Sequence, residues 1–231
     1  MTRHIKKLEA VLFDLDGTLI DTAADFHRII NILLSEKNLP TISYEDLLPS
    51  VSDGARAMVE RAFSKHIATD ISLEITSLQN RLLELYLAQT CVESRPFTGI
   101  TDTLTWLEQK SIPWGIVTNK PWLYTEPLMR QLNLKPAAGS VICPEHIEQK
   151  KPNPEGLLLA CQQLQCRPEN SVYVGDHIRD IEAGNRAGMV TIAAAYGYIS
   201  QDDNINNWNS NYNIQTATEL QPLLASHFTI H

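Results

Sequence analysis

The chain has 231 residues, of which 43% are hydrophobic, and its formal net charge is −8 at neutral pH. Its length and composition suit one large domain, or a core with a smaller insertion, and argue against a disordered chain. The acidic charge argues against a surface for nucleic acid or for an anionic membrane, and no apolar run is long enough to span a bilayer.

The first predicted strand is the short apolar run Val11–Phe13, which leads directly into Asp14-x-Asp16-Gly17-Thr18. No apolar signal region precedes it, so we expect a cytoplasmic protein. Two carboxylates two positions apart on an extended backbone point to the same side. Here they lie at the strand's C-terminal end, where open α/β sheets bind ligands. Because neighbouring acids repel each other, we expect a hard divalent cation to compensate them.

The next stretch, residues 22–90, has helical spacing and contains no strand candidate. Thr22-Ala23-Ala24-Asp25 resembles a capping box at the start of a helix that ends before Pro40. Two further helices are predicted, over 53–64 and 73–89. We therefore expect an all-helical insertion that occupies residues 19–91.

After Arg95 the pattern changes to alternating helices and strands. Strands are predicted at Trp114–Thr118, Ser140–Cys143, Val172–Gly175 and Val190–Ala193, with helices over 101–110, 122–132, 155–165 and 179–187. Strands separated by single helices predict a parallel, doubly wound sheet. The predicted fold is therefore α/β, with a core formed by residues 1–18 and 92–231. We interpret the Asn-rich segment 201–213 as a surface loop and expect a last helix near 217–225.

Polar residues stand at the ends of these strands. Besides Asp14 and Asp16, the candidates are Thr118-Asn119, Lys151-Pro152, and Gly175-Asp176 with Asp180 four positions later. Each group alone has an ordinary explanation as a turn, a loop or a helix cap. In a parallel sheet, however, these ends face one crevice. Together they predict a functional site.

Phosphoryl transfer through a covalent aspartyl-phosphate suits this set of residues. A carboxylate that approaches a phosphate dianion is repelled by roughly 8 kcal/mol at 4 Å in an effective dielectric of 20, so cations must be present. Three carboxylates can hold Mg²⁺, one lysine adds positive charge, and one hydroxyl can donate to phosphoryl oxygens. A further acid can protonate the leaving oxygen. These residues are, in that order, Asp14, Asp176 and Asp180; Lys151; Thr118; and Asp16.

In combination these motifs resemble the haloacid-dehalogenase-like (HAD) phosphohydrolases over nearly the whole chain. The resemblance implies that Asp14 is the nucleophile and Asp16 the general acid/base. It implies phosphate binding at Thr118-Asn119 and Lys151. It also implies Mg²⁺ bound by Asp14, the backbone carbonyl of Asp16 and Asp176, with support from Asp180. The helical stretch 19–91 resembles the family's mobile cap, which selects the substrate.

The chain most resembles the phosphoglycolate-phosphatase-like group, through Trp114–Pro121 and Val174–Gly184. Cys143–His146 and Gly197–Ile199 are also similar to the branch that hydrolyses N-acetylmuramic acid 6-phosphate. The resemblance thus implies a phosphatase that acts on a small phosphorylated metabolite with a carboxylate. We hypothesise that Arg56 binds this carboxylate, since a planar guanidinium suits it.

Other activities stay open. A haloacid dehalogenase would need neither Mg²⁺ nor a second acid, so Asp16 and Asp176 argue against it. A sugar-phosphate mutase of the same fold would share all these core residues. A non-catalytic binding module is opposed by the complete acid set. His177 is interpreted as a surface or loop histidine, and no pattern indicates an oligomeric state.

Overall fold

The computed structural model describes residues 7–64, 71–200 and 203–230. Within them, six parallel strands form one sheet in the order β5-β4-β1-β6-β7-β8. The strands are β1 (Ala10–Phe13), β4 (Trp114–Val117), β5 (Ser140–Ile142), β6 (Ser171–Gly175), β7 (Val190–Ala194) and β8 (Tyr212–Ile214). The first strand lies in the middle of the sheet, and later strands extend it on both sides. This confirms the predicted doubly wound α/β fold.

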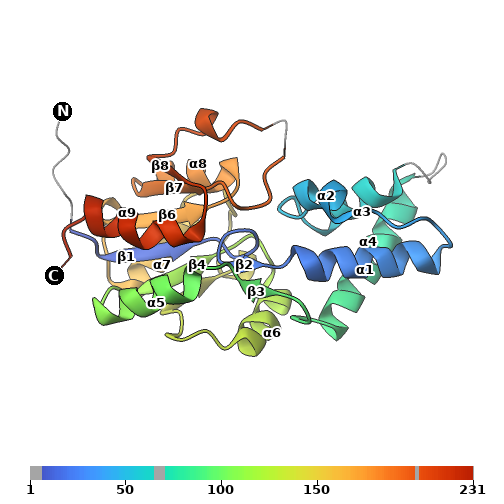
Figure 1. The fold of residues 1–231 in the computed structure, drawn as a ribbon, viewed down its shortest axis with the longest axis horizontal. Coiled ribbons are helices and arrows are strands. Elements are labelled where there is room, and N and C mark those ends of the chain that lie inside the picture. Colours follow the sequence, from blue (N-terminus) through green and yellow to red (C-terminus); the bar gives the residue numbers. More distant parts are fainter. Residues whose placement is uncertain (1–6, 65–70, 201–202, 231) are drawn as a thin grey trace.

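Helices cover both faces of the sheet (Figure 1). Side chains of β1 alternate between these faces, as the pleat of a strand requires. Val11 and Phe13 pack on the side of α5 (Ile100–Gln109) and α9 (Leu220–His227). Leu12 packs on the side of α7 (Glu155–Leu164), whose neighbour is α8 (Ile178–Arg186). A further helix, α6 (Trp122–Leu132), follows β4. The burial of this strand on both faces explains its continuous apolar sequence.

A second group of helices lies beside the sheet at its carboxyl edge (Figure 1). It consists of α1 (Ala23–Glu36), α2 (Tyr44–Leu47), the 3₁₀ turn Leu48–Ser50, α3 (Ala55–Phe63) and α4 (Ile71–Ala88). We call residues 23–88 the helical unit. Its helices bury a hydrophobic cluster of their own, in which the rings of Phe26 and Tyr86 stack with centroids 4.5 Å apart.

Two connectors join the helical unit to the sheet, the first at residues 19–22 and the second at residues 89–97. They pair with each other as a short antiparallel ribbon of β2 (Ile20–Asp21) and β3 (Arg95–Pro96). Across the described ranges, no helix is both long and apolar enough to cross a membrane.

The structure contradicts the surface-loop prediction at the end of the Asn-rich segment. Tyr212–Ile214 forms the edge strand β8, with Tyr212 opposite Ile192 of β7. Trp208 is 3% exposed and packs in a cluster with Ile181 and Ala193. Three residues are too few to show a strand period, so only the tertiary pairing reveals this strand. Residues 201–202 of the same segment lie outside the described residues.

The capping-box prediction is also wrong. The side chain of Thr22 makes no capping bond to α1, and its hydroxyl instead donates to Asp16 Oδ1 at 2.7 Å. Asp25 turns to the second connector, where it accepts hydrogen bonds from the Ser94 hydroxyl at 2.6 Å and from backbone N–H groups of Glu93 and Ser94. A local motif cannot reveal these partners, which lie far away in the sequence.

Candidate active site

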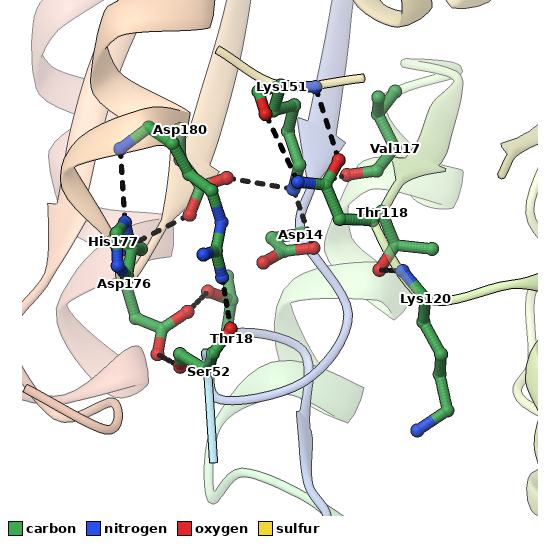
Figure 2. Close-up of polar contacts among 12 residues, drawn as sticks. Asp14, Thr18, Ser52, Val117, Thr118, Lys120, Lys151, Asp176, His177 and Asp180 are labelled. Atoms are coloured by element: carbon green, nitrogen blue, oxygen red, sulfur yellow. Dashed lines mark hydrogen bonds and ion pairs between the residues drawn. The ribbon is translucent and has the colours of Figure 1, made fainter. Parts of the chain in front are cut away.

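The polar residues predicted at the strand ends gather at one edge of the sheet (Figure 2). Asp14 follows β1, Thr118 follows β4 and Asp176 follows β6, and all three are buried. The chain turns sharply after Asp16 at Gly17, whose φ is +82°. A Cβ on Gly17 would lie 2.2 Å from Asp176 Oδ2, so only glycine allows both the turn and this close approach.

Lys151 is the centre of a buried ion cluster beside Asp14 (Figure 2). Its Nζ lies 2.8 Å from Asp14 Oδ1 and 2.8 Å from Asp180 Oδ1. It also donates to the Val117 carbonyl at 3.0 Å and to the Tyr173 hydroxyl at 2.9 Å. Burial opposes the charged ammonium, but Asp14 and Asp180 outweigh it and raise the pKa of Lys151. The lysine is therefore a fixed positive charge next to Asp14.

Three carboxylates form an acidic cluster: one oxygen each of Asp14, Asp176 and Asp180, all within 4.8 Å of one another. Lys151 supplies one positive charge against these three acids. Burial, and then repulsion from Asp14 and Asp180, raises the pKa of Asp176 to about 7. Burial also raises the pKa of Asp180, although Lys151 opposes this. Buried oxygen ligands with uncompensated negative charge fit a hard divalent cation such as Mg²⁺.

Asp176 is held in place from three directions. Its Oδ1 accepts a hydrogen bond from the Thr18 hydroxyl at 3.0 Å. Its Oδ2 accepts from the Ser52 hydroxyl and from the backbone N–H of Tyr198, each at 3.0 Å. Ser52 belongs to the loop before α3, so the helical unit contacts the acidic cluster directly (Figure 2).

Asp16 contacts a lysine that the sequence analysis missed. Its Oδ1 lies 2.9 Å from the Nζ of Lys120, two residues beyond Thr118. The Lys120 ammonium lies 4.6 Å from the ring centroid of Tyr86 and 5.0 Å from that of Phe26. Burial opposes its charge, but the neighbouring Asp16 raises the pKa of Lys120. The only sequence feature that points to Lys120 is its position directly after Thr118-Asn119, at the end of a predicted strand.

Asn119 uses its side chain to hold the Lys151 loop. Its Oδ1 accepts from the backbone N–H of Lys151, and its Nδ2 donates to the Lys151 carbonyl, both at 3.2 Å. The Thr118 hydroxyl accepts from the backbone N–H of Lys120 at 3.1 Å. The residues after β4 thus contact both Asp16, through Lys120, and the Lys151 loop, through Asn119.

His177 and Arg179, at the start of α8, contact the helical unit. His177 Nδ1 accepts from the Arg179 backbone N–H at 3.2 Å, and its Nε2 lies 3.3 Å from Asp53 Oδ1. The backbone N–H of His177 donates to Asp180 Oδ2 at 3.1 Å, and the Arg179 guanidinium donates to the Ser52 carbonyl. Burial, followed by the charge of Arg179, lowers the pKa of His177. His177 is thus a helix cap that faces the loop of residues 51–54.

A pocket of about 430 Å³ lies between the helical unit and the sheet edge. Asp14, Asp16 and Thr118 line it from the sheet. Arg56 also lines it, with its side chain 54% exposed and paired with Glu60 at 2.7 Å. The apolar residues in the wall are Phe26, Val51, Met58, Leu83, Tyr86 and Tyr124. Asp14, Asp16, Thr118, Asn119 and Arg56 therefore line one pocket, whose walls come from both parts of the chain. The other predicted residues, Lys151, Asp176 and Asp180, are buried beside Asp14.

Comparison with curated proteins gives relatives over almost the whole chain. An N-acetylmuramic acid 6-phosphate phosphatase from Pseudomonas putida is 41% identical over 220 residues, which cover 95% of this chain and 97% of the relative. The corresponding protein of Pseudomonas aeruginosa is also 41% identical. A phosphoglycolate phosphatase from Xanthomonas campestris is 37% identical, over 91% of this chain and 94% of the relative.

Solved structures share the fold. A crystal structure of a predicted phosphoglycolate phosphatase from Haemophilus somnus superposes with a TM-score of 0.82 at 23% identity, covering 94% of this chain and 97% of that one. CbbY from Rhodobacter sphaeroides, solved with phosphate, has a TM-score of 0.70 at 23% identity and covers 92% and 96% of the two chains. The family model of the haloacid dehalogenase-like hydrolases matches residues 11–194. The chain is therefore a phosphatase that belongs to the haloacid dehalogenase-like hydrolase family.

Proposed function

We propose that this phosphatase hydrolyses N-acetylmuramic acid 6-phosphate in a Mg²⁺-dependent reaction, through an aspartyl-phosphate at Asp14. The observation that carries the proposal is the pocket of about 430 Å³ that joins Asp14 and Asp16 to an apolar wall of the helical unit. The relatives from Pseudomonas, which carry the name of this activity and align over almost their full length, support the same substrate.

Asp14 and Asp16 divide the chemistry between them in this proposal. An oxygen of Asp14 bonds to phosphorus while the bond from phosphorus to the sugar oxygen breaks, and Asp16 gives its proton to that oxygen. Water then attacks the phosphorus and gives a proton to Asp16. The bond to Asp14 breaks, and inorganic phosphate leaves. Both carboxyl groups thereby return to their starting states.

Positive charge must offset the repulsion between the Asp14 carboxylate and the phosphate dianion, which is roughly 8 kcal/mol at 4 Å in an effective dielectric of 20. Lys151, 2.8 Å from Asp14 Oδ1, supplies one charge. Asp14, the backbone carbonyl of Asp16 and Asp176 would hold Mg²⁺, with Asp180 in support, and the ion would add positive charge beside the phosphoryl oxygens. The Thr118 hydroxyl would donate a hydrogen bond to the phosphate, and Asn119 would keep the Lys151 loop in place.

We further propose that residues 19–91 act as a cap on a catalytic core formed by residues 1–18 and 92–231. Three observations support this division. The helical unit has its own hydrophobic cluster, it joins the core through one paired ribbon, and it supplies a wall of the pocket. A cap built in this way would select the substrate and exclude water from the reaction.

The volume and the lining residues of the pocket favour an amino-sugar acid over a two-carbon acid. Phosphoglycolate would fill only a small part of a volume that is typical of larger ligands. The side chains of Met58, Leu83 and Tyr86 give apolar surface for the acetamido and lactyl methyl groups. Arg56 in the same wall suits the lactyl carboxylate. Phosphoglycolate is the second candidate, because the relatives from Xanthomonas carry that name.

A panel of kcat/KM values tests the substrate. It compares N-acetylmuramic acid 6-phosphate, N-acetylglucosamine 6-phosphate (which lacks the lactyl carboxylate), phosphoglycolate and β-glucose 1-phosphate, with and without Mg²⁺, and Asp14→Asn is the inactive control. We expect the first compound to give the highest value, inorganic phosphate as the product, and no turnover after chelation. A higher value for phosphoglycolate would establish the second candidate, and an isomeric sugar phosphate as product would identify a mutase.

A further inference from the structure

Tyr198, in the loop after β7, lies at the junction between the acidic cluster and the first connector. Its side chain is 4% exposed, and its ring belongs to the hydrophobic cluster of the helical unit although the residue comes from the core. Its backbone N–H donates to Asp176 Oδ2 at 3.0 Å. The preceding Gly197 allows this approach, because a Cβ there would lie 2.2 Å from the Cβ of Asp176.

The Tyr198 hydroxyl takes the place of a helix N-cap. It accepts hydrogen bonds from the backbone N–H groups of Thr22 at 2.6 Å and Ala23 at 2.9 Å, and it donates to Asp21 Oδ1 at 2.8 Å. Backbone N–H groups at the start of a helix need such an acceptor, which a local side chain usually supplies. Here the Tyr198 hydroxyl, from more than 170 residues away in the chain, accepts from both groups, and Asp21 Oδ1 also accepts from the backbone N–H of Ala23 at 3.2 Å.

This arrangement leaves the Thr22 hydroxyl free for another task. It donates to Asp16 Oδ1 at 2.7 Å, whereas an ordinary N-cap threonine would use its oxygen on its own helix. The Tyr198 hydroxyl therefore fixes the backbone of Thr22, and Thr22 in turn fixes Asp16. Burial, followed by the charge of Asp21, raises the pKa of Tyr198 well above its ordinary value, so the phenol keeps the proton that it donates.

We propose that Tyr198 is a positioning residue for the general acid: through the first connector and Thr22, its hydroxyl holds Asp16 in the orientation that protonates the leaving oxygen. The inference rests on the role of Asp16 in the proposed function. It adds that this orientation depends on a hydroxyl from the loop after β7, which also holds Asp176 through its backbone.

The test is Tyr198→Phe, which removes one oxygen and keeps both the ring and the backbone N–H. Tyr196→Phe is the matched control, because the Tyr196 hydroxyl donates at 2.9 Å to the carbonyl of Thr18, which directly precedes the first connector, and this bond does not involve Thr22 or Asp21. The readout is kcat/KM for an alkyl phosphate, such as an N-acetylhexosamine 6-phosphate, and for p-nitrophenyl phosphate. The alkyl leaving group needs a proton from the general acid, whereas p-nitrophenolate leaves without one.

We expect Tyr198→Phe to lower kcat/KM about tenfold for the alkyl phosphate and less than threefold for p-nitrophenyl phosphate, as a fraction of the general-acid contribution of about 10²–10⁴. Tyr196→Phe should leave the ratio of the two values unchanged. Loss of folded protein lowers both values equally, so the ratio separates positioning from a structural effect. Thr22→Val should show the pattern of Tyr198→Phe, and Thr22→Ser should restore the ratio, even if Tyr198→Phe folds poorly.

Asp16→Asn separates the positioning role of Tyr198 from the general-acid role of Asp16 in the proposed function. If it lowers the alkyl value far more than the p-nitrophenyl value while Tyr198→Phe and Thr22→Val leave the ratio unchanged, the positioning role is overturned and the proposed function stands. If Asp16→Asn itself lowers both values equally, the general-acid role and the positioning role are overturned together.

Discussion

Replacing Lys120 by methionine tests whether its ammonium ties Asp16 to the helical unit. Nζ lies 2.9 Å from Asp16 Oδ1 and within 5.0 Å of the ring centroids of Phe26 and Tyr86. Removing one partner of a buried ion pair costs about 3–5 kcal/mol, and we take the lower end because the Asp16 side chain is 18% exposed. Each ring contact adds about 0.5 kcal/mol. We therefore expect the free energy of unfolding to fall by about 4 kcal/mol.

Urea denaturation measures this loss, with Lys150→Met as the matched control. Lys150 is exposed and lines the same pocket, so its replacement removes the same charge from the pocket. We expect the control to change the free energy of unfolding by less than about 0.5 kcal/mol, as at most surface positions. Phe26→Leu should also cost about 0.5 kcal/mol less in the Lys120→Met background than in the wild type. A Lys120→Met variant within 1 kcal/mol of the wild type would refute this reasoning.

The remaining predictions concern the second connector, the pocket wall and the metal. Hydrogen bonds from Ser94, Arg28 and the Glu93 N–H outweigh burial and lower the pKa of Asp25 below 3.8, so Asp25 stabilises the fold above that pH and loses this effect as the pH falls. Asp25→Asn should therefore lower the free energy of unfolding by about 2 kcal/mol at pH 7, with a smaller difference in acid, and an equal difference at both pH values would contradict the assignment. Arg56→Ala should raise KM about tenfold for carboxylated substrates, the value of one charge-assisted hydrogen bond, but leave KM for p-nitrophenyl phosphate unchanged; equal effects would exclude Arg56 as the carboxylate ligand. Mg²⁺ should raise the midpoint of thermal unfolding of the wild type but not of Asp176→Asn, and an equal rise in both would place the ion elsewhere.

The sheet and its polar edge could be predicted from sequence because both depend on local patterns. Apolar runs such as Val11–Phe13 identify strands, and parallel topology then brings their carboxyl ends together, which places Asp14 and Asp176 at one edge of the sheet. Lys151 is distinguished from the adjacent Lys150 only by the family's Lys-Pro motif, and the structure shows its ion pair with Asp14. The acidic cluster followed for the same reason.

The parts that sequence patterns missed depend on partners distant in the chain. Thr22 and Asp25 have the spacing of a capping box, yet their partners are Asp16 and Ser94. In the sequence, Lys120 has the pattern of an ordinary turn residue. In the structure, its ammonium lies over the rings of Phe26 and Tyr86, which come from distant helices. In each case a tertiary contact replaces the local one that the motif predicts.

Rapid-quench analysis of the phosphoprotein tests the central claim most directly. The wild-type protein is mixed with N-acetylmuramic acid 6-phosphate and Mg²⁺, quenched in acid within one turnover, digested and analysed by mass spectrometry. We predict one phosphoryl group on Asp14, formed at a rate no slower than turnover, and none in Asp14→Asn. Release of phosphate at the full rate without a phosphorylated Asp14, or by Asp14→Asn, would contradict the account.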